Sequence, residues 1–176
     1  MNDLGRRLAE GDDEAFTEVV GHYAKRVYAL CYRLLRNEEE ARDMTQEVFM
    51  KVYLKRKSFK GCSQVYTWIY RIALNMCFSA LKARKAATVP LEEVEGFLAA
   101  ADPQGQDPAV ELEALVARAL EHLPPKQRGV FVMRFYDKLA FADIAEAMGT
   151  SQGAAKANFH FAVERLRRVL GEADVP

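Results

Sequence analysis

The sequence has few cysteines and no long apolar run, and both absences exclude classes of protein. Only three of the 176 residues are cysteine (Cys31, Cys62 and Cys77), and no two of them form a CxxC pair. Neither a disulfide framework nor a zinc site is therefore predicted. No apolar stretch is long enough to span a membrane, and the first residues lack the apolar centre of a signal peptide. We therefore expect a soluble, cytoplasmic protein.

Acidic side chains are missing from the middle of the chain, although the whole chain is neutral, with 25 Lys or Arg and 25 Asp or Glu. From Val48 to Leu91 there are nine Lys or Arg and no acid. Residues 1–47 hold seven basic and eleven acidic side chains, and residues 92–123 hold one and eight. Such blocks predict a basic central surface that attracts a polyanion. A merely solvated basic face is the alternative.

The signatures of an enzyme are also absent. No Walker loop and no GxGxxG occurs, and the three histidines (His22, His122 and His160) lie on separate predicted helices. Catalytic sites need convergent groups, so we expect no catalytic residue, no cofactor and no metal.

What the sequence does contain is helical periodicity, without β-type alternation of useful length. Apolar stripes predict helices from about Phe16 to Leu35, from the acidic "NEEE" onward, and over 64–85. Further helices are predicted over 111–123, after Pro125, over 141–148 and over 152–170. Between them, "AATVPLEEVEGFLAAADPQGQDPAV" has the proline, glycine and acid of a flexible linker. The predicted fold is all-α, with small helical domains at 1–86 and 111–172 and a linker at 87–110.

The segment "LAFADIAEAMGTSQGAAKANFHFAVERLRR" has the spacing of a helix-turn-helix. Gly149 supplies the left-handed turn and Ser151 the N-cap of the second helix. The N-terminal part of that helix enters the major groove in this motif. An αα-hairpin without a DNA role would show the same periodicity. The outward residues near this end are Gln152, Gly153, Lys156, Ala157 and His160. Farther along, Arg165, Arg167 and Arg168 are placed to reach phosphates.

The helix over 64–85 carries a second candidate surface. Arg71, Asn75, Phe78, Lys82 and Lys85 share one face, which mixes cations, an amide and a ring. Such a face suits single-stranded nucleic acid, whose bases stack on rings. Trp68 and Tyr70, on the same helix, are alternatively core residues.

Three motifs, which follow one another along the chain, together indicate a known family: "DMTQEVFMKVY", "SFKGCSQVYTWIYRIALN" and "LPPKQRGVFVMRFYDKLAFADIAEAMGTSQGAAKANFHFAVERLR". Over about residues 12–171 the chain resembles the extracytoplasmic-function (ECF) group of bacterial sigma factors. The resemblance implies a dissociable subunit of RNA polymerase. Its first domain would bind the polymerase clamp and melt the promoter −10 element, and its second would bind the −35 element as duplex.

The resemblance also implies three sets of contact residues. The clamp-facing residues, all expected to be exposed, are Asp43, Gln46, Glu47 and Phe49. The −10 single strand would be contacted by Phe59, Gly61, Ser63, Tyr66, Thr67, Trp68, Arg71, Asn75, Ser79 and Lys82. The −35 duplex would be contacted by Ser151, Gln152, Gly153, Lys156, Ala157, Asn158, His160, Phe161 and Arg165.

Some positions depart from the family pattern. Asn158 and Phe161 stand where members often have Arg, so the −35 preference stays open. Phe161 is expected to be exposed, either to contact a thymine methyl group or to pack on a regulator. Ala140 stands where a Ser N-cap is usual, which weakens that helix by about 1 kcal/mol.

Three further expectations concern how the protein is regulated and which class of DNA-binding protein it belongs to. The resemblance implies an anti-sigma factor, often membrane-bound, that would hold the protein at the membrane. Cys62 is either a redox sensor or an incidental loop cysteine. A LuxR-type helix-turn-helix regulator is the rival interpretation, because it explains residues 110–171 equally well.

Overall fold

A computed structural model describes residues 3–87 and 108–172, which are helical and contain no β-strand. The all-α prediction is confirmed. The first half contains α1 (Asp3–Glu10), α2 (Asp13–Leu35), α3 (Glu38–Lys55), the 3-10 turn η1 (Arg56–Ser58) and α4 (Val65–Ala87). The second half contains α5 (Pro108–Ala119), η2 (Leu120–His122), α6 (Pro125–Phe135), α7 (Phe141–Met148) and α8 (Gln152–Glu172).

The helix starts follow from local capping. The Asp12 carboxylate accepts from the backbone N–H groups of Glu14 at 2.8 Å and Ala15 at 3.1 Å, which starts α2. The Asn37 side chain accepts from the N–H of Glu40 at 3.0 Å and starts α3. Each side-chain oxygen satisfies a donor that has no partner within the first turn.

Helix α1 was not predicted from the sequence. It has only eight residues and its stability depends on contacts with α2 and η1, which local propensity does not reveal. Leu8 is fully buried there, and Arg7 forms ion pairs with Asp12 at 2.8 Å and Glu18 at 3.3 Å. Helix α5 begins at Pro108, inside the linker expected at 87–110, and most of that linker lies outside the described residues.

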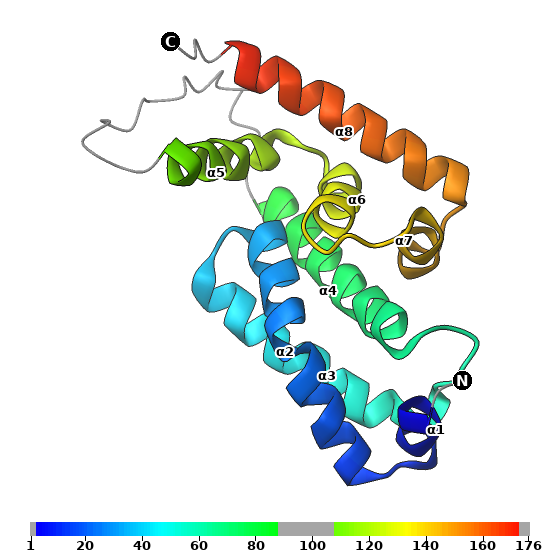
Figure 1. The fold of residues 1–176 in the computed structure, drawn as a ribbon. Coiled ribbons are helices and arrows are strands. Elements are labelled where there is room, and N and C mark those ends of the chain that lie inside the picture. The colour runs from blue at the N-terminus through cyan, green and yellow to red at the C-terminus, as the bar shows by residue number, and fades with distance from the viewer. Residues whose placement is uncertain (1–2, 88–107, 173–176) are drawn as a thin grey trace.

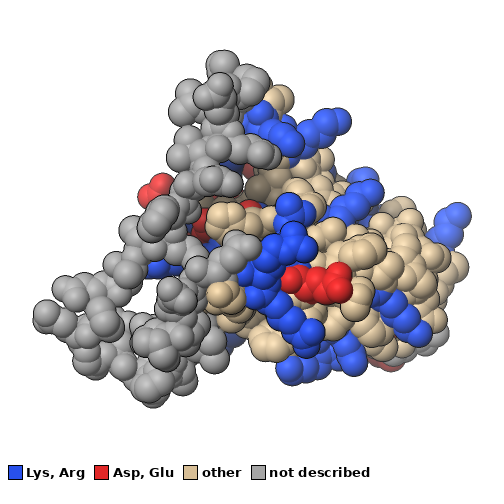
Figure 2. Space-filling model, turned by 90° about the horizontal axis from the view of Figure 1, so that it is seen from above, with Lys and Arg blue, Asp and Glu red and all other residues tan. Residues whose placement is uncertain are grey.

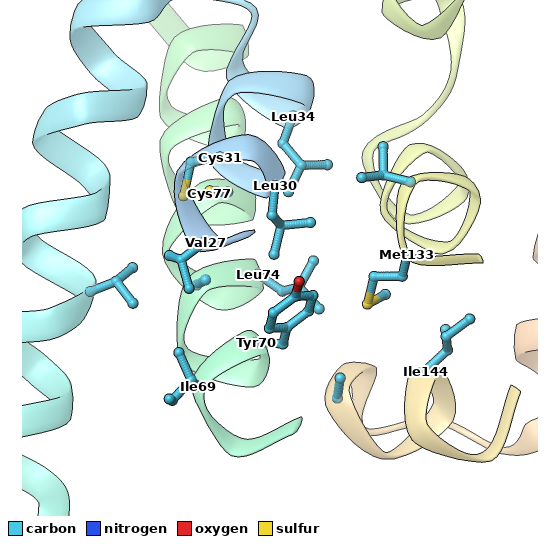
Figure 3. Packing of buried hydrophobic residues seen from close by; sticks show 14 of the residues in the cluster. Val27, Leu30, Cys31, Leu34, Ile69, Tyr70, Leu74, Cys77, Met133 and Ile144 are labelled. Carbon is cyan, nitrogen blue, oxygen red and sulfur yellow. Dashed lines mark hydrogen bonds between the residues drawn. The ribbon is translucent and has the colours of Figure 1, made fainter. Parts of the chain in front are cut away.

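Both halves share one hydrophobic cluster. Helices α2, α3 and α4 pack together, α6 and α7 pack under α8, and α6 and α7 also contact α4 (Figure 1). Figure 3 shows Tyr70 and Leu74 of α4 on one side of this contact, with Met133 of α6 and Ile144 of α7 on the other. The sequence left the relative placement of the halves open, and the structure brings them into direct contact.

Candidate nucleic-acid interfaces

Helix α4 presents a polar face to solvent. Arg71, Asn75, Ser79 and Lys82 are all exposed and recur every three or four residues, so they lie along one side of the helix. The Ser79 hydroxyl donates to the backbone oxygen of Asn75 at 2.8 Å. Lys85, which was also predicted on this face, is exposed, and no acidic side chain lies on α4. Phe78 is a correction to the predicted face, because its half-buried ring packs against Gly129 of α6.

A groove of about 390 Å³ runs between α3 and α4 beside this face. Asn75 and Ser79 line it from α4, and Lys51 and Lys55 line it from α3. The two lysines were not among the residues predicted from the sequence, although they lie four residues apart within the acid-free segment and so share a helix face. The remaining lining residues are Met44, Glu47, Ile72, Met76 and Ala80.

Part of the segment 59–68, which comprises the loop before α4 and the first turn of α4, lies in the core, against the expectation that it faces DNA. Phe59 is only 4% exposed, and Thr67 is buried. Trp68 is half-buried with its ring 5.2 Å from that of Phe59, which agrees with the core alternative for Trp68. These side chains hold the loop against the helices, because removing the aromatic surface from water stabilises the folded state.

The other residues predicted to contact DNA from this segment, in the loop and at the start of α4, are placed differently. Gly61 has φ of 68°, a left-handed conformation that a residue with a Cβ resists. Gly61, Ser63 and Tyr66 are half-buried, while Cys62 is exposed. Burial raises the pKa of the Tyr66 hydroxyl, and a hydrogen bond with Asp143 of α7 raises it further. Tyr66 therefore faces the second half of the chain.

The predicted clamp-facing set is exposed except for Phe49. Asp43, Gln46 and Glu47 face solvent on α3, but Phe49 is only 8% exposed. Helix α3 contacts α2 and also α4, so its buried sector is wider than the single stripe expected from the sequence. An exposed aromatic at this position was a wrong expectation.

The helix-turn-helix has the predicted geometry. Gly149 has φ of 63° after α7, and its N–H donates to the Glu146 carbonyl at 3.2 Å. The Ser151 hydroxyl accepts from the N–H of Ala154 at 3.1 Å and caps α8. Ala140 begins α7 without a side-chain cap, as expected. The turn therefore ends α7 and sets the start of α8, and the two helices pack against each other.

The outward residues at the start of α8 are exposed as predicted: Ser151, Gln152, Gly153, Lys156, Ala157, His160 and Arg165. Phe161 is 53% exposed, also as expected. Asn158 instead is half-buried and donates its amide to the carbonyl of Ala154 at 2.9 Å, so it is turned back on its own helix. Figure 2 views the side of the molecule on which α8 lies, where basic side chains outnumber acidic ones.

Comparisons with known proteins cover both halves. Residues 19–87 match the family described as Sigma-70 region 2, and residues 113–166 match Sigma-70, region 4. The chain is 31% identical to the ECF RNA polymerase sigma factor SigW of Bacillus subtilis, over 94% of each chain. It is also 31% identical to the ECF RNA polymerase sigma-E factor of Escherichia coli K12, over 93% of this chain and 90% of that one.

Solved structures share the fold. The structure of CnrH in complex with the cytosolic domain of CnrY has a TM-score of 0.73 at 22% identity and covers 97% of this chain and 96% of CnrH. The sigma factor RpoE in complex with the anti-sigma factor NepR, from Bartonella quintana, has a TM-score of 0.69 at 23% identity, over 89% of this chain and 96% of RpoE.

A helix-turn-helix domain joined to a basic helical domain is the architecture of a promoter-binding initiation factor. With the matches above, the chain belongs to the ECF group of the sigma-70 family of RNA polymerase sigma factors. A LuxR-type regulator is not supported, because the region 2 match accounts for the half of the chain that such a regulator leaves unexplained. Within the described residues, no helix is both long and apolar enough to cross a bilayer.

Proposed function

We propose that residues 1–86 bind core RNA polymerase and open the −10 element, that residues 87–110 link the halves, and that residues 111–172 bind the −35 element. The observation that carries the proposal is the pairing of an exposed α8 N-terminus with an acid-free face on α4. A carboxylate on either surface would repel the DNA phosphates. The protein acts on promoters inside the cell, where polymerase is.

The −10 strand would lie along the acid-free face of α4, at the edge of the groove whose α3 wall carries Glu47 as well as two lysines. Arg71 and Lys82 would contact phosphates, and Asn75 and Ser79 would contact base edges. Lys51 and Lys55 on the opposite wall would add further phosphate contacts. Gly61, Ser63 and Tyr66 would border the strand, while Phe59, Thr67 and Trp68 would hold the loop in place from the core.

Strand opening would be driven by binding alone, without catalysis. Opening a base step requires a few kcal/mol, and contacts to an extruded base return about 1–3 kcal/mol. No covalent bond is made or broken in this step, so the protein is proposed not to be an enzyme.

The −35 duplex would meet the start of α8. Gln152 and Lys156 would reach base edges, and Ser151, Gly153 and Ala157 would allow close approach to the backbone. His160, Phe161 and Arg165 would follow along the groove. Asn158 could contact the DNA only after its side-chain amide breaks the hydrogen bond to the Ala154 carbonyl.

Two partners are proposed. The polymerase clamp would meet Asp43, Gln46 and Glu47 on α3, with Phe49 supporting that helix from within. An anti-sigma factor would hold the protein inactive. The sigma factor RpoE, which shares this fold, was solved in complex with the anti-sigma factor NepR, and this supports the proposal.

The direct test adds the purified protein to core RNA polymerase and maps transcript starts on fragmented genomic DNA. We expect discrete starts that share motifs about 35 and 10 bases upstream. Binding to duplex DNA without any start would contradict the proposed role of residues 1–86. Lys82→Ala should lower initiation while leaving binding to core polymerase unchanged, because Lys82 lies on α4, away from the proposed clamp face.

A further inference from the structure

Phe161 of α8 is a large apolar side chain that the fold leaves in solvent. It is 53% exposed, whereas Phe159, two residues earlier, is half-buried with its ring 5.9 Å from that of Phe131. The ring of His160, on the same helix, lies 6.1 Å from that of Phe161. The core of the second half therefore uses the ring of Phe159 and leaves the ring of Phe161 facing outward.

The surface of α8 next to Phe161 is small and apolar. Ala157 and Gly153, four and eight residues before Phe161, are both exposed and lie along the same side of the helix. A helical side chain leans toward the N-terminus of its helix, so the Phe161 ring covers the turn that contains Ala157. Phe161 thus reaches toward the end of α8 that is proposed to enter the major groove.

The polar side chains on either side of Phe161 are engaged within the helix. On one side, Asn158 donates its side-chain amide to the carbonyl of Ala154 at 2.9 Å. On the other side, Nε2 of His160 lies 3.3 Å from Oε1 of Glu164. A base is read directly either by a polar group that bonds its edge or by an apolar group that touches a methyl group. Phe161 can touch a base without first breaking a bond of the first kind.

Basic side chains lie to both sides of this apolar surface along α8. Lys156 comes before Phe161, and Arg165 and Arg168 follow it, and all three are exposed. Cations that contact phosphates position a protein on the duplex but carry no information about the sequence. Discrimination between bases at this part of the helix is therefore left to the Phe161 ring.

Thymine is the base that offers an apolar group in the major groove. Its C5 methyl group projects there, whereas the other three bases present hydrogen-bond donors and acceptors. Burying one methyl group against a ring should tighten binding about fourfold, which corresponds to about 0.8 kcal/mol. An arginine at the same position would instead favour guanine, because it bonds the O6 and N7 atoms of that base.

We propose that Phe161 selects a thymine in the −35 element by packing its ring on the C5 methyl group. The inference rests on the proposed binding of the −35 duplex by α8, and it adds which base this part of the helix reads and by which chemistry. The sequence left two roles open for Phe161, a thymine contact and a contact with a regulator. Its place beside Ala157, on the side of α8 proposed to enter the groove, favours the thymine contact.

The test measures how much of the affinity for DNA comes from one methyl group. Core RNA polymerase carrying the full-length protein would be titrated, by fluorescence anisotropy, against a duplex with the −35 element of a promoter identified by the transcript mapping. Each thymine of that element would be replaced in turn by uracil, which differs only in lacking the C5 methyl group. Phe161→Ala removes the ring. Phe135→Ala is the matched control, because Phe135 is 47% exposed but lies on α6.

We expect uracil at one thymine position or more to weaken binding of the natural chain about fourfold. This ratio of affinities should fall to about one in Phe161→Ala and stay at about four in Phe135→Ala. Phe161→Leu, which keeps an apolar side chain, should retain part of the ratio. Because Phe161 is exposed, neither substitution there removes a side chain from the core.

Two results would overturn the inference. One is a −35 element in which no thymine methyl group affects the affinity of the natural chain, and the other is a dependence on the methyl group that persists in Phe161→Ala. Failure of the proposed function would look different. Core polymerase carrying the natural chain would then give no discrete transcript starts, or would bind the −35 duplex no better than an unrelated duplex of the same length.

Discussion

At the scale of single residues, the three cysteines occupy very different surroundings. Cys31 and Cys77 are fully buried between α2 and α4 with their sulfur atoms 3.7 Å apart (Figure 3), whereas Cys62 is exposed in the loop before α4. The contact with Cys31, together with burial, raises the pKa of the Cys77 thiol. A buried thiol reacts slowly for two reasons. The reagent cannot reach the sulfur atom, and burial disfavours the thiolate, which is the form that reacts.

Thiol titration should therefore find one fast group in the native protein. We expect Cys62 alone to react within seconds to minutes, and Cys31 and Cys77 to react only after denaturant is added. Cys62→Ser should abolish the fast phase and leave the two slow thiols. A second fast thiol in the native protein would mean that the contact between α2 and α4 is looser than described.

Asp137 is an acidic residue at the contact between the halves, where it accepts a hydrogen bond from the Tyr70 hydroxyl. Burial raises the pKa of this carboxyl, while the Tyr70 hydroxyl and the nearby Arg33 and Arg26 act in the opposite direction. A raised native pKa means that ionised Asp137 weakens the native state above that pKa. As the pH falls through it toward the ordinary value of about 4, this penalty disappears.

Asp137→Asn should then raise the melting temperature at pH 7.5, because the amide resembles the protonated carboxyl. The difference from the natural chain should shrink as the pH falls toward about 4, the ordinary pKa of an aspartate. Differential scanning calorimetry at a series of pH values checks both points. A gain that stayed constant with pH would show that ionisation of Asp137 is not its cause.

At the scale of elements, the starts of α7 and α8 differ in their N-terminal caps. Ser151 caps α8 through its hydroxyl, while Ala140 leaves α7 without a side-chain cap although its backbone is extended, with φ of −67° and ψ of 150°. That conformation suits a capping residue, so only the side chain is missing.

Ala140→Ser should stabilise the protein by about 1 kcal/mol, and Ser151→Ala should destabilise it by a similar amount. Urea unfolding followed by circular dichroism measures both. Ala142→Ser is a matched control, since it adds a hydroxyl two residues farther on, inside α7, where no cap forms. Equal effects at 140 and 142 would exclude capping as the cause.

The groove between α3 and α4 supplies a second prediction at this scale. Lys51→Ala and Lys55→Ala should each weaken binding of single-stranded DNA, because each removes a phosphate partner. The slope of log affinity against log salt should fall by about 0.7 per lysine. Anisotropy titrations across a salt series measure this slope. Lys126→Ala, at the exposed start of α6, should leave it unchanged.

The sequence predicted these elements well where the determinants are local. Asn37, Gly149 and Ser151 act through backbone groups within a few residues, so the helix boundaries that they set were predicted closely. The burial of Phe49 and Phe59 depends on helices distant in sequence, and periodicity along one helix could not predict it. Helix α1 was missed for the same reason, since its contacts rather than its composition stabilise it.

At the scale of the whole molecule, the main feature that the sequence did not predict is the contact between the halves. Of the side chains that meet there, Tyr70 was singled out from the sequence, as an alternative core residue of its own helix. Nothing in either periodic pattern indicates that the two stripes meet each other across the chain. Gly129 was a visible signal, because a glycine within a helix often marks the close approach of a neighbour.

The shared core has a consequence during protein synthesis. Helix α4 leaves the ribosome before α6 and α7 have been made, so Tyr70 and Leu74 have no covering partner while the rest of the chain is translated. At typical elongation rates of about 5–20 residues per second, this interval lasts roughly 3–12 seconds between Leu74 and Met133. During that time the nascent first half is the form most open to chaperones and to aggregation, and rapid translation of the second half protects it.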